Sequence, residues 1–309
     1  MDMHLRFMNL DSPTKEGLFA RMMRVIQRDP TLPAFSSTSE ELMQLCKKED
    51  VSMEEISKIV ELDPGLTAKY LRLANSPAFL TAEKISSVED ALVRIGMNEV
   101  RKLASLIAVV DVCHHFRVNV LVAHIDWRAF WLHNLMTARL THQVTELYRP
   151  PSGKEYLAGL MHDVGKLFWE HYFPKEFQQV LNYSAEKSCT MYETECLLYD
   201  TNHADIGWAL CERWSLDPEI CRAVRFYHDP ASAYNKQDDK DLDPKLLPAC
   251  LCVANELAKG ALLPNFDVEK VDEWSHLEGY QRLQPLSINL TEQREFAQHT
   301  IESLLGMHP

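Results

Sequence analysis

Helix start and stop signals recur along the whole chain, and they constrain its fold more than any other feature. Asp63 followed by Pro64 combines a capping acid with a proline at the first helical position. Ser87 with Asp90 three residues later resembles a capping box, and Gly96 ends that short segment. Strand-like alternation is scarce, and the 309 residues include only 10 glycines. The sequence therefore predicts an all-α protein.

Hydrophobic periodicity and caps predict six helices with assigned bounds, over residues 14–28, 63–75, 87–96, 126–148, 217–228 and 247–259. In the first of these, Leu18, Met22 and Ile26 form one apolar stripe. A further helix is expected to end at His162-Asp163, and another to hold His203 in its first turn. The long polar stretch 231–246 is expected to be an exposed loop, because it carries four aspartates between helical segments.

Composition narrows the class of protein. A hydrophobic content of 46% supports a sizeable core, and no apolar stretch approaches the ~20 residues that span a bilayer. The net charge of −13 and the dispersed basic residues argue against a nucleic-acid surface, which needs clustered lysine and arginine. The eight cysteines are scattered without a Cys-x-x-Cys pair and are expected to be buried free thiols that act as small hydrophobic residues. With no secretory signal at the N-terminus, we expect a cytoplasmic protein.

The dipeptide His162-Asp163 is the strongest candidate for chemistry. Its imidazole and carboxylate are donors that suit Mg, Mn, Fe or Zn, so the pair could hold a divalent metal. Lys166 follows closely and could bring a positive charge to a phosphate.

Three further histidines lie on apolar helix faces at helix-length separations. They are His133, His203 and His228. Helical bundles build metal sites from inward ligands on several helices, so these side chains could converge on His162-Asp163. The alternative is that each is a core histidine hydrogen-bonded to backbone or to a carboxylate. The residues alone leave both interpretations open.

The order of these residues resembles the metal-dependent phosphohydrolase superfamily that is named for its HD motif. A more specific resemblance comes from the stretch 62–76, LDPGLTAKYLRLANS, followed by ISSVEDALVRIG at 85–96. Together with the HD half, the chain looks like an HDOD domain, the HD-related output domain of bacterial signalling proteins, over about residues 32–260. This resemblance implies an all-α module of two lobes.

The resemblance also implies a domain organisation. We expect an N-terminal accessory helix in 1–29 and an HDOD domain in 30–262, followed by a C-terminal helical extension in 263–309. Within the domain, 30–118 would form the N-terminal helical lobe and 123–262 the HD-like lobe. Asn75 and Ser76 of the LANS segment are expected to cap a helix or pack between lobes rather than recognise a ligand.

The candidate metal ligands implied by the resemblance are His133, His162, Asp163, His203, His228 and Asn255. HD hydrolases end their ligand set with an aspartate, and this chain has Asn255 at the matching position. An amide oxygen is a neutral, weaker ligand, so metal charge would be less well balanced. The paired histidines and Gly-Tyr-Pro signature of cyclic-di-GMP phosphodiesterases are also missing, which argues against that activity.

Two functions follow from these observations. The first, which we favour, is a non-enzymatic signal-transduction module with a degenerate HD site that acts through contacts with signalling proteins, rather than with nucleic acid or a membrane. The alternative is a metal-dependent phosphohydrolase acting on a nucleotide or another phosphoester. In that case Lys166 would offset phosphate charge and water activated by the metal would be the nucleophile.

Overall fold

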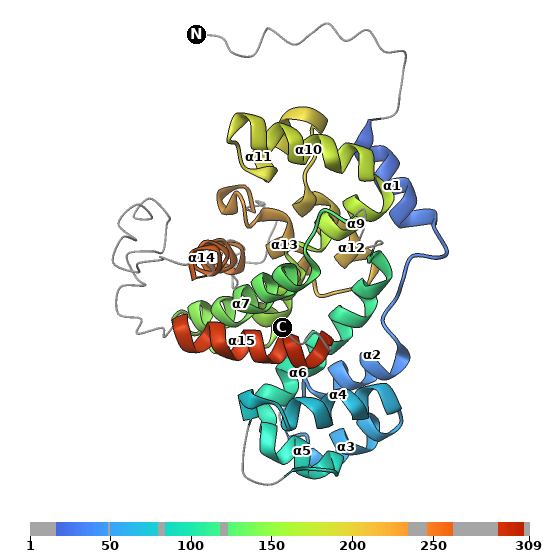
Figure 1. Ribbon diagram of the computed structural model, residues 1–309, viewed down its shortest axis with the longest axis vertical. Coiled ribbons are helices and arrows are strands. Elements are labelled where there is room, and N and C mark those ends of the chain that lie inside the picture. Colours follow the sequence, from blue (N-terminus) through green and yellow to red (C-terminus); the bar gives the residue numbers. More distant parts are fainter. Residues whose placement is uncertain are drawn as a thin grey trace, which may run out of the picture.

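The computed structural model describes residues 17–48, 50–79, 84–117, 123–233, 246–261 and 290–305. Within these ranges every regular element is a helix, as the sequence predicted (Figure 1). The α-helices are α1 (Leu18–Arg28), α2 (Ser37–Leu45), α3 (Met53–Glu61), α4 (Pro64–Ala74), α5 (Val88–Ile95), α6 (Met97–Cys113), α7 (Trp127–Glu146), α8 (Lys154–Met161), α9 (Val164–Tyr172), α10 (Pro174–Lys187), α11 (Met191–Tyr199), α12 (His203–Arg213), α13 (Pro218–Phe226), α14 (Leu246–Ala261) and α15 (Leu290–Leu305). Short 3₁₀ helices are η1 (Pro77–Phe79), η2 (His114–Phe116) and η3 (Pro230–Ala233).

The six segments predicted as helices correspond to α1, α4, α5, α7, α13 and α14. Asp63 caps α4 by accepting hydrogen bonds from the backbone N–H groups of Gly65 and Leu66. Ser87 caps α5 through the N–H of Asp90, but Asp90 bonds the Ser87 hydroxyl instead of its backbone, so the predicted capping box is incomplete. Of the predicted helix 14–28, residues 14–16 lie outside the described residues, as do 234–245 of the predicted loop.

The first lobe consists of α2 to α5 packed on the start of α6, in the lower part of Figure 1. The helix α6 then runs into the second lobe, where it meets α8 and η2. Its residues 106–110 are all buried, as expected for a helix that is covered on every side. One hydrophobic core therefore continues from the first lobe into the second.

The second lobe surrounds α7. This helix packs along α14 and α8, while α9 packs on α12, and α13 contacts both α12 and α14. The contact between α7 and α8 is close because α8 places Gly159 against Ala138, where an added Cβ would lie 2.4 Å from the Ala138 Cα. Only a residue without a side chain allows the two backbones to approach this far.

Helices near the two ends of the described chain pack on the second lobe. The helix α1 buries Leu18, Met22 and Ile26, the stripe predicted from the sequence, and it contacts α12. The helix α15 lies against α7 and also reaches α4 and η1 of the first lobe. The predicted accessory and C-terminal segments thus contain elements that are packed into the molecule.

Two smaller predictions concern cysteines and membranes. All eight cysteines are free, and Cys189, Cys196 and Cys252 are only partly buried. Among the described residues, no helix combines the length and the hydropathy that crossing a bilayer requires. The Asn75 side chain donates to the carbonyls of Leu71 and Ile85 and accepts from the Ile85 N–H, which agrees with its expected structural role.

Candidate metal centre

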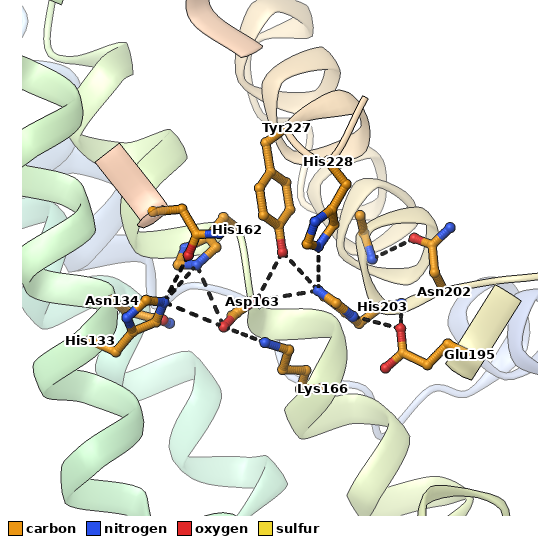
Figure 2. Close-up of polar contacts among 12 residues, drawn as sticks. His133, Asn134, His162, Asp163, Lys166, Glu195, Asn202, His203, Tyr227 and His228 are labelled. Atoms are coloured by element: carbon orange, nitrogen blue, oxygen red, sulfur yellow. Dashed lines mark hydrogen bonds and ion pairs between the residues drawn. The ribbon is translucent and has the colours of Figure 1, made fainter. Parts of the chain in front are cut away.

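The structure brings the predicted site residues together from five parts of the second lobe, and Figure 2 labels all of them except Asn255. His133 comes from the middle of α7, and His162 and Asp163 form the short junction between α8 and α9. His203 is the first residue of α12, and His228 follows the end of α13. Lys166 and Asn255, on α9 and α14, complete the cluster through contacts to Asp163 and His133.

A close crossing of α9 and α12 places His203 beside Asp163. A Cβ on Gly165 would lie 2.0 Å from the His203 carbonyl oxygen and 2.8 Å from the Gly207 nitrogen. The two backbones can touch because both helices have glycine at the crossing. The glycines that follow His162-Asp163 and His203 in the sequence are therefore needed to assemble the cluster.

His133, His162 and Asp163 form a group whose potential ligand atoms all lie within 4.8 Å of one another. The Nε2 atoms of His133 and His162 are 3.3 Å apart, and Asp163 Oδ2 lies 3.8 Å and 3.5 Å from them, respectively. Ligand atoms about 2.1 Å from one metal ion are about 3.0–3.4 Å apart in octahedral or tetrahedral geometry. The observed spacing is close to that of a coordination sphere.

A hydrogen bond fixes the tautomer of His162. Its Nδ1 lies 2.8 Å from the Gly159 carbonyl oxygen, which can only accept, so Nδ1 carries the proton. The Nε2 lone pair then points toward His133 and Asp163. Such a hydrogen bond on the opposite ring nitrogen is typical of histidine ligands in metal sites.

The other oxygen of Asp163 faces a second pair of histidines. Asp163 Oδ1 accepts a hydrogen bond of 3.0 Å from the Tyr227 hydroxyl and lies 3.4 Å from His203 Nε2. His203 Nε2 is also 2.7 Å from the Tyr227 hydroxyl and 3.0 Å from His228 Nε2. Asp163 therefore lies between two histidine pairs, as Figure 2 shows.

Glu195 on α11 belongs to the site although the sequence analysis did not single it out. Its Oε2 lies 2.6 Å from His203 Nδ1 and accepts a 2.8 Å hydrogen bond from the His203 backbone N–H. The side chain is fully buried, and burial raises the pKa of Glu195 to about 8. The hydrophobic periodicity of α11 does not predict this role, because the helix buries Glu195 and leaves Leu197 exposed.

Tyr227 was also not predicted as a site residue, although it adjoins His228. It is buried, and burial raises the pKa of its hydroxyl well above the usual value. Because the phenol stays neutral, its hydroxyl can donate a hydrogen bond to the Asp163 carboxylate beside it.

The electrostatics of the cluster favour neutral imidazoles and an ionised carboxylate. Burial lowers the pKa of His133 to about 3 and that of His162 to about 4. Burial alone would raise the pKa of Asp163, but His162, Lys166 and the other histidines hold it well below its usual value. Neutral imidazole and ionised carboxylate are the forms that bind metal.

Comparison with known proteins agrees with this arrangement. The family model of the HDOD domain matches residues 32–230. The chain belongs to the HDOD family. The match includes the first lobe, Lys166 and five of the six candidate metal ligands, whereas Asn255 and α15 lie beyond it.

Solved structures share the fold of this HDOD protein over most of its length. An HDOD domain protein of unknown function from Geobacter sulfurreducens is 25% identical, with a TM-score of 0.69 over 91% of this chain and 97% of that one. A candidate phosphohydrolase from Shewanella amazonensis SB2B is 22% identical, with a TM-score of 0.66 over 92% and 98%. A candidate signal transduction protein from Marinobacter aquaeolei VT8 is 22% identical, with a TM-score of 0.66 over 89% and 60%.

A curated relative extends well beyond the matched region. An uncharacterized protein of Treponema pallidum (strain Nichols) is 22% identical over 208 residues, which are 66% of this chain. The HDOD chain spans about two fifths of the length of that relative, 39%.

The residues present fit a divalent metal. His133, His162 and Asp163 provide two imidazole nitrogens and a carboxylate at suitable spacing, and Asn255 adds an amide oxygen 3.0 Å from His133 Nε2. The set supplies one negative charge, because Asp163 is the only acid among the six candidate ligands. The spacing of the ligand atoms suits a divalent metal better than their total charge does, because one carboxylate balances only part of the charge of a dication.

Proposed function

We propose that this HDOD protein is a regulatory module that acts through contacts with signalling proteins, and that its HD centre holds the second lobe together without hydrolysing a substrate. A divalent metal, when bound by His133, His162, Asp163 and Asn255, would add Lewis-acid character to the centre. The side chains of the centre contact one another and thereby hold together the helices that carry them.

The observation that carries this proposal is the use of Asp163. Both of its oxygens already have protein partners, with Lys166 Nζ 2.6 Å from Oδ2 and the Tyr227 hydroxyl 3.0 Å from Oδ1. Lys166 therefore neutralises the one carboxylate of the ligand set. A lysine that is paired with this acid is less available to a phosphate, and an acid with two donors is a weaker general base.

Asn255 supports the same conclusion. Its Oδ1 lies 3.0 Å from His133 Nε2, so it can accept a hydrogen bond from His133 in the absence of metal. This bond joins α14 to α7 directly. An aspartate at this position would instead bring a second negative charge to the centre.

A phosphohydrolase is the second candidate, and the coordination-like spacing of His133, His162 and Asp163 favours it. In that function the histidines would orient the centre, and Lys166 would turn from Asp163 to balance the charge of a bound phosphoester. The partly exposed members of the cluster are His133, Lys166 and His228, and a substrate would enter past them. The side chains of His133 and Lys166 are 15% and 21% exposed.

The test compares the wild type with Asn255→Asp and His162→Ala. Metal per chain is measured by elemental analysis after purification without added metal, and hydrolysis of a generic phosphodiester is measured on the same samples with Mn²⁺, Fe²⁺, Zn²⁺ or Mg²⁺. We expect substoichiometric metal and negligible hydrolysis in the wild type, more metal in Asn255→Asp, and no metal in His162→Ala.

Two outcomes would contradict this expectation. Turnover in the wild type that His162→Ala removes would establish the phosphohydrolase. Equal and negligible metal in all three proteins would show that the histidines have a purely structural role. Circular dichroism of His162→Ala should remain helical, which separates loss of metal from loss of fold.

A further inference from the structure

The helix α15 covers a surface that is shared by the two lobes. It packs along α7 and extends over α4 and η1, and it lies beyond the region matched by the family model. Figure 1 shows it alongside α7 at the level where the two lobes meet. We call the surface of α4, η1 and α7 that α15 covers the docking face.

Arginines from both lobes line the docking face. Arg128 on α7 forms an ion pair with Glu302, and Arg139 donates through Nε to Gln293 Oε1 at 2.6 Å. Arg72 on α4 donates to the Ser303 carbonyl oxygen at 3.3 Å. Arg139 also forms an ion pair with Glu99 of α6, so the positive charge that α15 covers comes from Arg72 and Arg128, and this charge favours an acidic ligand.

Aromatic contacts also join α15 to the docking face. Phe296 of α15 meets Phe79 of η1 edge-to-face, with ring centroids 5.5 Å apart. The guanidinium of Arg139 lies 4.0 Å from the centroid of the Phe296 ring on the α7 side. One aromatic side chain of α15 is thus held by both lobes, as an anchor residue in a helix-binding groove would be.

The buried side of α15 is only partly apolar. Ala297, Ile301 and Leu304 are apolar and buried, but the polar Gln293 and Thr300 share the same side. The buried Thr300 hydroxyl has no hydrogen-bond partner among the described residues. A buried hydroxyl without a partner weakens the packing of α15.

We propose that the docking face binds an acidic amphipathic helix of a partner protein, which takes the place of α15. This inference rests on the proposed function, because it identifies the partner through which the module would act. The fitting helix has apolar residues at the positions of Phe296, Ile301 and Leu304 and an acid at the position of Glu302. Binding in a groove through one helix face is a common mode of helix recognition.

The experiment uses a fluorescent, end-blocked peptide of residues 290–305 as the probe and the full-length chain as the receptor. In the wild type, α15 competes at a high effective concentration. In the full-length Ile301→Asp variant, α15 loses its central buried contact. We expect the peptide to bind this variant at least about ten-fold more tightly than the wild type, measured by fluorescence anisotropy.

Charge reversal tests the acidic specificity on the Ile301→Asp background. Arg128→Glu should weaken peptide binding by about five-fold, whereas Arg213→Glu, on the exposed end of α12, should not. A peptide with Glu302→Lys should bind the Arg128→Glu protein better than the original peptide does. Equal binding to the wild type and to Ile301→Asp, or no effect of Arg128→Glu, would overturn the proposal.

Hydrogen exchange of the wild-type protein gives an independent test that needs no variant. We expect the amides of α15 to exchange through a local opening while those of α7 remain protected. Exchange of α15 only together with α7 would overturn the proposal, since the helix would then not be displaceable. Metal content and hydrolysis do not enter these measurements, so failure of the docking face and failure of the proposed function are distinguishable.

Discussion

Replacing Gly165 by alanine tests whether the crossing of α9 and α12 assembles the HD centre. The added Cβ would lie 2.0 Å from the His203 carbonyl oxygen, and Cβ contacts under 3.0 Å are essentially never observed. Because the three obstructing atoms all belong to the α12 backbone, no side-chain rotation relieves the clash. The two helices must separate by about 1 Å, which a close-packed core resists.

The expected loss of stability follows from the type of contact that the added methyl group makes. Overpacking a core by one methyl group costs about 1–3 kcal/mol, and a backbone obstruction belongs at the upper end. A loss of about 3 kcal/mol corresponds to a decrease in Tm of about 5 °C for a chain of this length. Separation would also move His203 Nε2 from its position 3.4 Å from Asp163 Oδ1.

Thermal unfolding monitored by circular dichroism measures the effect, and Gly17→Ala provides the control. Gly17 precedes α1, and an added Cβ there meets nothing within 4 Å, so its Tm should stay close to that of the wild type. If Gly165→Ala and Gly17→Ala unfold at the same temperature, α12 tolerates displacement and the crossing does not constrain the centre.

Three other predictions concern stability. First, His133 and His162 have pKa values lowered to about 3 and about 4, so below about pH 6.5 the unfolded state binds more protons than the metal-free folded state. The free energy of unfolding should therefore decrease as the pH falls below about 6.5, by up to about 2.7 kcal/mol per pH unit for the two histidines. Urea midpoints that do not change between pH 7.5 and 5 would refute this. Second, Glu195→Ala should cost about 3 kcal/mol in urea unfolding, because the buried backbone N–H and the ring Nδ1 of His203 both lose their hydrogen-bond partner, and Glu195→Gln should cost less. Third, Asn75→Ala should lower stability by about 2 kcal/mol through three lost hydrogen bonds, and Asn75→Asp, which cannot donate, should not restore it; an unchanged urea midpoint for Asn75→Ala would refute the structural role.

Local signals predicted the helices that begin with strong caps, such as α4 after Asp63 and α13 after Asp217. The sequence also placed His162-Asp163 at the end of a helix, and the boundary between α8 and α9 confirms this, although neither position is a proline or glycine. The cause is tertiary, because the junction turns both side chains into a cluster that includes His203. Periodicity within one segment carries no information about such a contact.

The ligand set was predictable for a different reason. Inward positions of His133 and His203 follow from their apolar stripes, but their convergence on Asp163 came from the family resemblance. Neither the apolar stripes nor the family resemblance indicated Glu195 as a site residue. Hydrophobic periodicity would place Leu197 of α11 inside, but the acid is buried instead because it hydrogen-bonds the backbone N–H and the ring Nδ1 of His203.

Burial of the centre separates the two functions on physical grounds. A phosphoester would have to lose its hydration and pass His133 and Lys166, and it would then compete with Asp163 for the ammonium group of Lys166. Because the Asp163 and His203 side chains are 5% and 1% exposed, catalysis would require α7 or α9 to move away from the cluster. A metal ion bound by protein ligands needs no such opening, nor does a module that acts through its surface. Metal without turnover is therefore the result that this geometry favours, and turnover would require a second conformation of these helices.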